Sequence, residues 1–427
     1  MRANPQENHL DFCGRMANPC AQPPYGRRCW SPDSRASPRD DVVSPQNGSA
    51  TGGWPVGSSK LRQSIDLNLF YMAPTFLLPV QARFGRRLAS LASVLALLAC
   101  APAFADTVYT VRQSFTVKDV PADAKQVRGW FWMPEDRPEQ RVMEFRVVEA
   151  PPSFRITRDP RYGRSWLHAE VAANPDKPLR IVTEFKILRR GVSGMADAKQ
   201  AGLMTDEYRR AFAAELRGDE KQMEVTPEIR FVANDLAGKE TNPVLMARKF
   251  FQYVIDKSDH YSKWGTMPKG LCLGSAKECM AGTGDCCSDQ HALFIALCRA
   301  RGIPCRMMFG SRLKPENEGK NHDPGYRCWP NFFAPGLGWV PLDISSADAA
   351  PVERAGDWFG GLDDMRVEWA EGRDFDLEPR SAVRPDLVIR GWVEVDGKPH
   401  KGLDRVVNFN RQAMTTDISA TTKTALK

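Results

Sequence analysis

Apolar and polar residues alternate along the chain from Thr107 to about Leu188. Met143, Phe145 and Val147, for example, are separated by single charged residues, and a second run near residue 185 repeats the pattern. An alternation with a period of two is typical of strands that bury one face, and the Pro-Asp, Asp-Pro and Gly signals between the runs are typical of turns. The pattern predicts a small antiparallel β-sandwich that serves as a packing or spacer domain.

The period lengthens to that of a helix from Thr205 onward. "TDEYRRAFAAEL" and "NPVLMARKFFQYVIDK" are predicted helices, and the second has Asn242 as its N-cap and Pro243 at its first position. "CSDQHALFIALCRARGIP" predicts a buried helix that is closed by Gly302. Strand-like segments follow at residues 304–310, 326–333 and 338–342, and further extended segments lie near "LVIRGWVEVDGKP".

Residues 72–105 have the pattern of a secretory leader. Arg86 and Arg87 end a basic flank, residues 88–99 are apolar, and an A-x-A cleavage signal ends at Ala105. The apolar run is short of the ~20 residues that a membrane-spanning helix needs, which makes a permanent anchor the weaker interpretation. Cys100 also allows the alternative of a lipoprotein signal. Because leaders begin a chain, we expect Met72 to be the true start and residues 1–71 to be an unstructured extension.

The charge balance does not indicate a nucleic-acid partner. The chain has a formal net charge of +7, but residues 1–105 hold eleven Lys or Arg and six Asp or Glu, which leaves +2 for the exported part. That part has no basic cluster with interleaved aromatic residues.

The exported part contains seven cysteines, an odd number. In an oxidising compartment at least one of them is then a free thiol or forms an intermolecular bond. The sequence favours a disulfide between Cys272 and Cys279. Zinc is the alternative for this loop, but the C-x2-C spacing of zinc ribbons is missing. Cys298 and Cys305 are expected to be buried as small apolar residues or to form a disulfide.

Cys287 is the candidate for chemistry because it precedes the buried helix. The unpaired N–H groups and the positive dipole end of a helix N-terminus stabilise a thiolate, and the same N–H groups can hold a developing oxyanion. A thiolate nucleophile also needs a base that moves protons, and a residue that orients the base.

Two stretches carry a resemblance to a known family. "GTGDCCSDQHALFIALCRARGIPCR" followed by "GYRCWPNFFAPGLGWVPLD" resembles the transglutaminase-like superfamily, whose fold is related to papain-like cysteine proteases. In that family a Gly-x-Cys precedes a helix that ends in Arg-x-x-Gly-Ile-Pro-x-Arg, a His-x-Trp opens a later strand, and Gly-Trp-Val-x-x-Asp ends the next one. The resemblance runs from about Asn242 to Asp374.

The resemblance assigns roles by position. The nucleophile is Cys287, because the spacing back from Gly-Ile-Pro selects the second cysteine of the pair, and the acid that orients the base is Asp343. Trp264 and Trp329 are expected to line the substrate cleft. The expected histidine is replaced by Arg327, which stays protonated near neutral pH and cannot act as a base.

Two histidines are candidate substitute bases. His291 lies one helical turn beyond Cys287, where related secreted proteins often carry a histidine with a structural role. His322 lies in a loop before Arg327. Without a histidine partner, Asp343 is expected to form an ion pair with Arg327. Cys286 is expected to bond to another loop cysteine, with a vicinal disulfide to Cys287 as the alternative.

These observations predict an α+β fold with a transglutaminase-like cysteine domain at 201–380, preceded by a β domain at 106–200 and followed by a β segment and tail at 381–427. The resemblance implies a periplasmic or secreted protein that hydrolyses peptide or Gln-type amides or transfers their acyl group, with a peptide or protein substrate and no metal or organic cofactor. No dense acidic calcium loop is present. The alternative is an inactive relative whose cleft binds a peptide or envelope partner.

Overall fold

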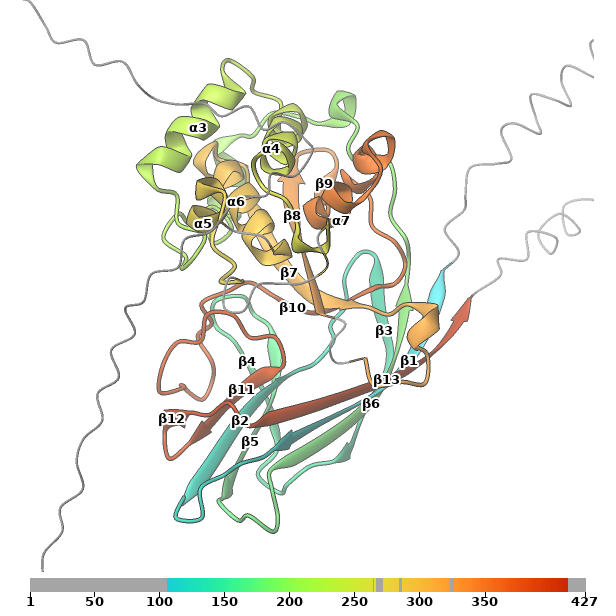
Figure 1. Ribbon diagram of the computed structural model, residues 1–427, viewed down its shortest axis with the longest axis vertical. Coiled ribbons are helices and arrows are strands. Elements are labelled where there is room, and N and C mark those ends of the chain that lie inside the picture. Colours follow the sequence, from blue (N-terminus) through green and yellow to red (C-terminus); the bar gives the residue numbers. More distant parts are fainter. Residues whose placement is uncertain (1–105, 264, 266–271, 284–285, 323–325, 414–427) are drawn as a thin grey trace, which may run out of the picture. The chain divides into compact units, whose positions relative to one another are not determined.

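The computed structural model describes residues 106–263, 265, 272–283, 286–322 and 326–413 (Figure 1). The predicted leader and the predicted upstream extension, with Met72 and Cys100, lie outside these residues, as does Trp264. Among the described helices, none is long and apolar enough to cross a membrane.

The N-terminal domain consists of two antiparallel sheets. One has the strand order β13-β1-β6-β3 and the other β12-β11-β2-β5-β4. The strands are β1 (Thr107–Val117), β2 (Gln126–Trp132), β3 (Gln140–Glu149), β4 (Arg155–Arg158), β5 (Ser165–Ala172), β6 (Arg180–Arg189), β11 (Gly391–Val395), β12 (Lys398–Pro399) and β13 (Leu403–Ala413).

Both sheets contribute to one apolar core, as predicted for a sandwich. Phe115 of β1 stacks on Phe131 of β2 with ring centroids 4.8 Å apart, and Leu167, Ile181 and Val393 pack in the same cluster. The C-terminal strands belong to these sheets, because β13 pairs with β1 along its whole length and β11 pairs with β2. The chain therefore forms most of the N-terminal domain, then the helical domain, and completes the N-terminal sheets with its last strands. The sequence pattern predicted a separate β segment at residues 381–427.

The second domain places helices on a third sheet of order β10-β7-β8-β9. Its strands are β7 (Cys305–Arg312), β8 (Tyr326–Ala334), β9 (Gly338–Pro341) and β10 (Arg366–Glu371). Its helices are α2 (Asp206–Ala211), α3 (Pro227–Ala237), α4 (Pro243–Lys257), α5 (Ala276–Ala281), α6 (Cys287–Ala300) and α7 (Ile344–Ala349). Short 3-10 turns are η2 (Ala198–Gln200), η3 (Tyr261–Lys263), η4 (Pro315–Asn317) and η6 (Val352–Trp358).

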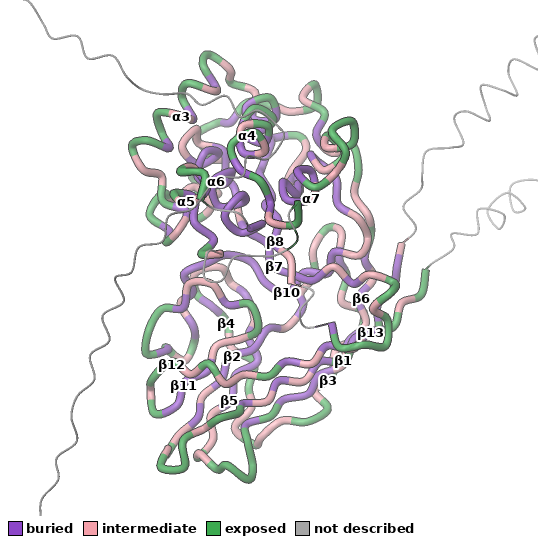
Figure 2. The backbone as a smooth tube through the Cα atoms, viewed as in Figure 1, coloured by how far each residue is buried: buried purple, intermediate pink, exposed green. Residues whose placement is uncertain are grey.

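Helix α6 is the centre of this domain, and nearly every residue of it is buried (Figure 2). It packs on β7 and β8 and is surrounded by α3, α4, α5 and α7. The opposite face of the sheet meets the sandwich, where Trp369 of β10 packs edge-on against Phe185 of β6. The mixed α and β architecture and the preceding β-rich region confirm the predicted fold class.

Local sequence signals account for the ends of the longer helices. The side chain of Asn242 accepts hydrogen bonds from the backbone N–H groups of Val244 and Leu245, and Pro243 occupies the first turn of α4, as predicted. Gly302 follows α6 with a positive φ of 70°, which glycine adopts at little cost.

Candidate functional site

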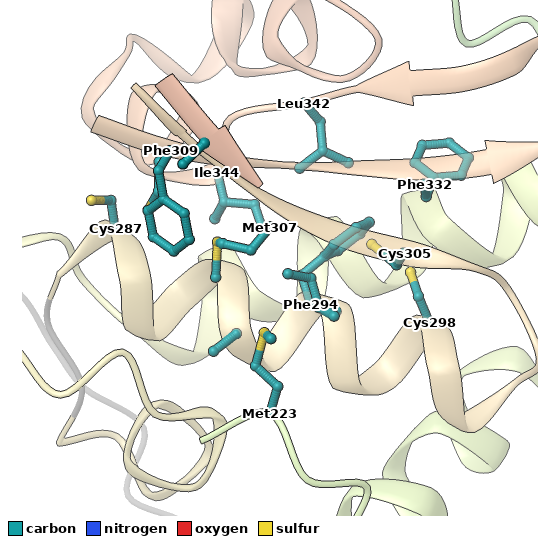
Figure 3. Close-up of a cluster of buried hydrophobic side chains, with 14 of the residues drawn as sticks. Met223, Cys287, Phe294, Cys298, Cys305, Met307, Phe309, Phe332, Leu342 and Ile344 are labelled. Atoms are coloured by element: carbon teal, nitrogen blue, oxygen red, sulfur yellow. The ribbon is translucent and has the colours of Figure 1, made fainter. Parts of the chain in front are cut away.

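Cys287 is the first residue of α6, and 7 % of its surface is exposed. Its position at the helix N-terminus, predicted from the sequence, gives its sulfur the positive end of the helix dipole (Figure 3). The preceding turn is fixed by Asp289, whose carboxylate accepts hydrogen bonds from the backbone N–H groups of Cys286 and Ser275. This arrangement holds the sulfur at the edge of the core.

A disulfide joins Cys272 to Cys286, which corrects the predicted pairing of Cys272 with Cys279. Cys279 is instead buried in α5, inside the loop that the disulfide closes. The expectation that Cys286 bonds to another loop cysteine is confirmed. Cys272, Cys286 and Asp289 bring potential metal-ligand atoms within 4.8 Å of one another, but the disulfide removes the two thiolates that zinc would need.

Cys328 of β8 faces the N-terminus of α6, where its Sγ lies 3.4 Å from Ser288 Oγ, and its thiol is in hydrogen-bonding contact with Cys287. A hydrogen bond from the Cys328 thiol is the main reason why the pKa of Cys287 lies well below its ordinary value; burial opposes this shift, and contacts with histidine add to it. Burial and the neighbouring sulfur raise the pKa of Cys328 well above its ordinary value. The surroundings therefore favour the thiolate form at Cys287 and the neutral thiol at Cys328.

His260 is the histidine in hydrogen-bonding contact with the Cys287 sulfur. Its Nδ1 lies 2.8 Å from Ser262 Oγ, and its backbone N–H donates to Asp348 Oδ2 at 2.6 Å. The ring also packs against Tyr261, with centroids 4.5 Å apart. Backbone and ring contacts thus orient the imidazole toward the Cys287 sulfur.

His291 connects Cys328 to Asp343 and does not itself bond to Cys287. Its Nδ1 lies 3.2 Å from Cys328 Sγ. Its Nε2 accepts a hydrogen bond from the backbone N–H of Ile344 at 3.1 Å and lies 3.5 Å from Asp343 Oδ1. The ring is fully buried between α6 and α7.

Asp343 caps the N-terminus of α7, where its carboxylate accepts hydrogen bonds from the hydroxyls of Ser345 and Ser346 and from the Ser346 backbone. Its cation is Arg366 of β10, and both side chains are completely buried. Burial alone would raise the pKa of Asp343, but the Arg366 guanidinium, followed by His291 and Ser345, holds it well below its ordinary value. Asp343 is therefore an ionised carboxylate in the core.

Arg327 lies on the other face of β8, which corrects the expected ion pair between Arg327 and Asp343. Tyr326 and Cys328 face α6, where both approach Ser288. Successive strand residues point to opposite faces, so Arg327 points away from α6. Its Nη1 donates to the backbone carbonyl of Tyr326, and its strand partner is Gly310. In this arrangement Arg327 neither holds Asp343 nor approaches the nucleophile.

Two further predicted residues also lie away from Cys287. Trp329 shares the face of Arg327, is 1 % exposed, and packs with Met308 and Leu362, so it fills the core and does not line an open cleft. The Nε2 of His322 contacts the backbone carbonyl of Arg312 at 2.7 Å, and its ring packs against Phe409 of β13. His322 is therefore a structural residue at the boundary of the two domains.

Three residues of the site were not predicted: Cys328, His260 and Arg366. Cys328 could have been found from the sequence, because residues alternate between the two faces of β8 and Cys328 therefore lies on the opposite face from Arg327. His260 lies in the loop after α4 and Arg366 in a distant strand. Neither has a local sequence signal, because only the tertiary fold brings them to Cys287 and Asp343.

Comparisons with known proteins agree with this fold. Residues 230–344 match the family model of the transglutaminase-like superfamily. An uncharacterised protein of Haemophilus influenzae is 29 % identical over 205 residues, which cover 40 % of this chain and 53 % of that protein. The chain thus spans about half the length of this relative.

Two solved structures are similar over much of the chain. One is a candidate cysteine protease from Cytophaga hutchinsonii, with 14 % identity and a TM-score of 0.48 over 73 % of this chain and 92 % of that one. The other is the periplasmic domain of TgpA from Pseudomonas aeruginosa bound to ethylmercury, with 13 % identity and a TM-score of 0.30 over 62 % of this chain and 96 % of that one.

Proposed function

We propose that the protein is a thiol-dependent enzyme that cleaves amides or transfers their acyl group, with Cys287 as the nucleophile. One observation carries this proposal: the Cys287 sulfur lies at a helix N-terminus, within hydrogen-bonding contact of both Cys328 and His260. These surroundings favour the thiolate, which is the reactive form of cysteine. The match of residues 230–344 to the transglutaminase-like superfamily supports the same class of reaction.

In the proposed reaction, the Cys287 thiolate attacks the amide carbonyl and forms a carbon–sulfur bond. The N-terminal N–H groups of α6 stabilise the oxyanion. His260 then serves as the acid that gives a proton to the departing amine as the carbon–nitrogen bond breaks, and Nδ1 of its ring lies 2.8 Å from Ser262 Oγ. Water or a second amine then attacks the thioester carbonyl and gives a proton back to His260, and the carbon–sulfur bond breaks to release the acyl group and the Cys287 thiolate.

His291 and Asp343 act as positioning residues in this proposal. The ionised Asp343 faces Nε2 of His291, and Nδ1 of the same ring contacts Cys328 Sγ. This chain of contacts fixes the Cys328 thiol, whose hydrogen bond contributes most to the low pKa of Cys287. The base function that the family assigns to the position of Arg327 is therefore taken over by His260.

We further propose that the substrate is a peptide or a Gln-type amide and that the protein acts after export. The secretory pattern of residues 72–105 and the disulfide between Cys272 and Cys286 support an oxidising compartment. A catalytically silent binding module is the competing proposal. It is favoured by one observation, the limited exposure of Cys287.

The test is the pH dependence of Cys287 alkylation by iodoacetamide, followed by mass spectrometry on the full chain without reductant. Because its folded pKa is lowered, we expect labelling to begin well below the ordinary cysteine pKa of 9.0. His260→Gln removes a hydrogen bond and a charge that favour the thiolate, so the labelling profile should move to higher pH. Amide turnover should fall by about 10²-fold or more, the usual contribution of an acid–base residue.

His322→Gln is the matched control, because it replaces a part-buried histidine that does not contact Cys287. Its labelling profile should equal that of the wild type. A Cys287 that is not alkylated at any pH would favour the silent module. Equal profiles for His260→Gln and the wild type would remove His260 from the proposed mechanism.

A further inference from the structure

We propose that Cys287 and Cys328 form a reversible disulfide that switches the nucleophile off under oxidation, with Cys328 as the resolving cysteine. The observation behind this proposal is the position of Cys328 on β8: its Sγ lies 3.4 Å from Oγ of Ser288, the residue that follows Cys287 on α6, and its thiol is in hydrogen-bonding contact with Cys287. The loss of activity on oxidation depends on the proposed function of Cys287. The disulfide itself does not, because it can be measured without any substrate.

The surroundings of the two sulfurs give them different roles. Cys287 retains exposed surface, whereas Cys328 is completely buried, so an oxidant from solvent reaches Cys287 first. The thiolate character of Cys287 also makes it the sulfur that oxidants attack. Cys328 is held against it by Ser288 Oγ at 3.4 Å and by His291 Nδ1 at 3.2 Å.

A peroxide supplies the oxidising equivalent in two steps. The Cys287 thiolate attacks hydrogen peroxide, the oxygen–oxygen bond breaks, and the products are a sulfenic acid and hydroxide. The Cys328 sulfur then attacks the Cys287 sulfur and displaces its hydroxyl group, which leaves with the Cys328 proton as water. One thiolate, one thiol and one peroxide thus give one disulfide, one molecule of water and one hydroxide.

The chain contains a second contacting pair of thiols that serves as a control. Cys298 of α6 and Cys305 of β7 are within hydrogen-bonding contact, but both are completely buried, and burial raises the pKa of Cys298 well above its ordinary value. Contact alone therefore does not make a pair responsive. The combination of contact, access and thiolate character distinguishes Cys287 and Cys328.

The experiment exposes the full chain to hydrogen peroxide, with dimedone present to trap sulfenic acid, and maps the cysteines by tandem mass spectrometry. In the wild type we expect a peptide pair that is linked through Cys287 and Cys328 and lacks two hydrogen atoms. Alkylation of Cys287 should be lost and should return after treatment with dithiothreitol. In Cys328→Ser, the sulfenic acid cannot be resolved, so the dimedone adduct should form on Cys287.

Cys305→Ser should behave like the wild type, because it removes one thiol of the control pair only. The proposal is overturned if wild-type Cys287 is converted to the dimedone adduct or a higher oxide without the linked peptides. It is also overturned if peroxide leaves both cysteines reduced. The measurement on the wild-type protein does not depend on the folding of a variant. If Cys287 is still alkylated rapidly after peroxide treatment and no disulfide forms, this inference is wrong, but the proposed acyl transfer is not affected.

Discussion

The two ends of α6 place the same chemical group in opposite environments. At the N-terminus Cys287 contacts Cys328 of β8. Near the C-terminus Cys298 contacts Cys305 of β7 (Figure 3). The pKa of Cys287 lies well below the ordinary value, whereas burial raises the pKa of Cys298 well above it. Each cysteine has a cysteine neighbour, so the neighbour alone does not decide which sulfur is reactive.

The difference comes from what surrounds each pair. The N-terminal end has the positive end of the helix dipole, His260, His291 and the buried ion pair between Asp343 and Arg366. The C-terminal pair lies in the apolar core near Phe294 and Phe332 and has the negative end of the dipole (Figure 3). The surroundings thus favour the thiolate at one end of the helix and the neutral thiol at the other.

The largest expected effect on stability follows from removing Arg366, the cation near the N-terminal end of α6. Arg366→Met leaves the Asp343 carboxylate buried without its guanidinium, and breaking such a pair costs about 3–5 kcal/mol. We expect the free energy of unfolding in urea to fall by that amount. The folded pKa of Asp343 lies below its ordinary value of 3.8, so its stabilising contribution is present above that value and is lost as the pH falls. The variant should therefore lose less stability than the wild type on acidification.

Arg354→Met is the control for this prediction. Arg354 pairs with Asp357 at the surface, and its side chain is 72 % exposed. Its removal should change the free energy of unfolding by less than about 1 kcal/mol, because exposed ion pairs contribute little. Equal effects of the two substitutions would contradict the view that buried charges hold the N-terminal end of α6.

A smaller effect is expected at the apolar end. Cys298→Ala removes one heavy atom from a packed core, and the small cavity should lower the free energy of unfolding by about 1 kcal/mol. The pH profile of Cys287 alkylation should not change, because Cys298 takes no part in the polar cluster. A shifted profile would show that the two ends of the helix are coupled, and it would contradict the view that their surroundings act independently.

The sequence predicted the elements of the site better than its contacts. Helix α6, the place of Cys287 at its N-terminus and the strands β7 to β9 follow local patterns of apolar residues and turns, and these patterns are present in the chain without the fold. Asp343 was singled out by motif. The partner of Asp343 was not, because Arg366 reaches it from β10 only after the sheet has formed. The disulfide was misassigned because spacing along the sequence does not show which cysteines meet in space. Helix α5 lies between Cys272 and Cys286 in the sequence, yet the fold brings their Cα atoms to 5.6 Å from each other.

The smallest expected effect is at Arg327, where the family pattern has histidine. A histidine introduced there would stand on the face of β8 that carries Trp329, opposite Gly310, and not on the face of Cys328. We therefore expect Arg327→His to leave both the pH profile of Cys287 alkylation and amide turnover at wild-type levels. The free energy of unfolding should change by no more than about 0.5 kcal/mol. Turnover that appears in this variant alone would mean that residue 327 can reach the nucleophile, and it would transfer the role of the base from His260 to that position.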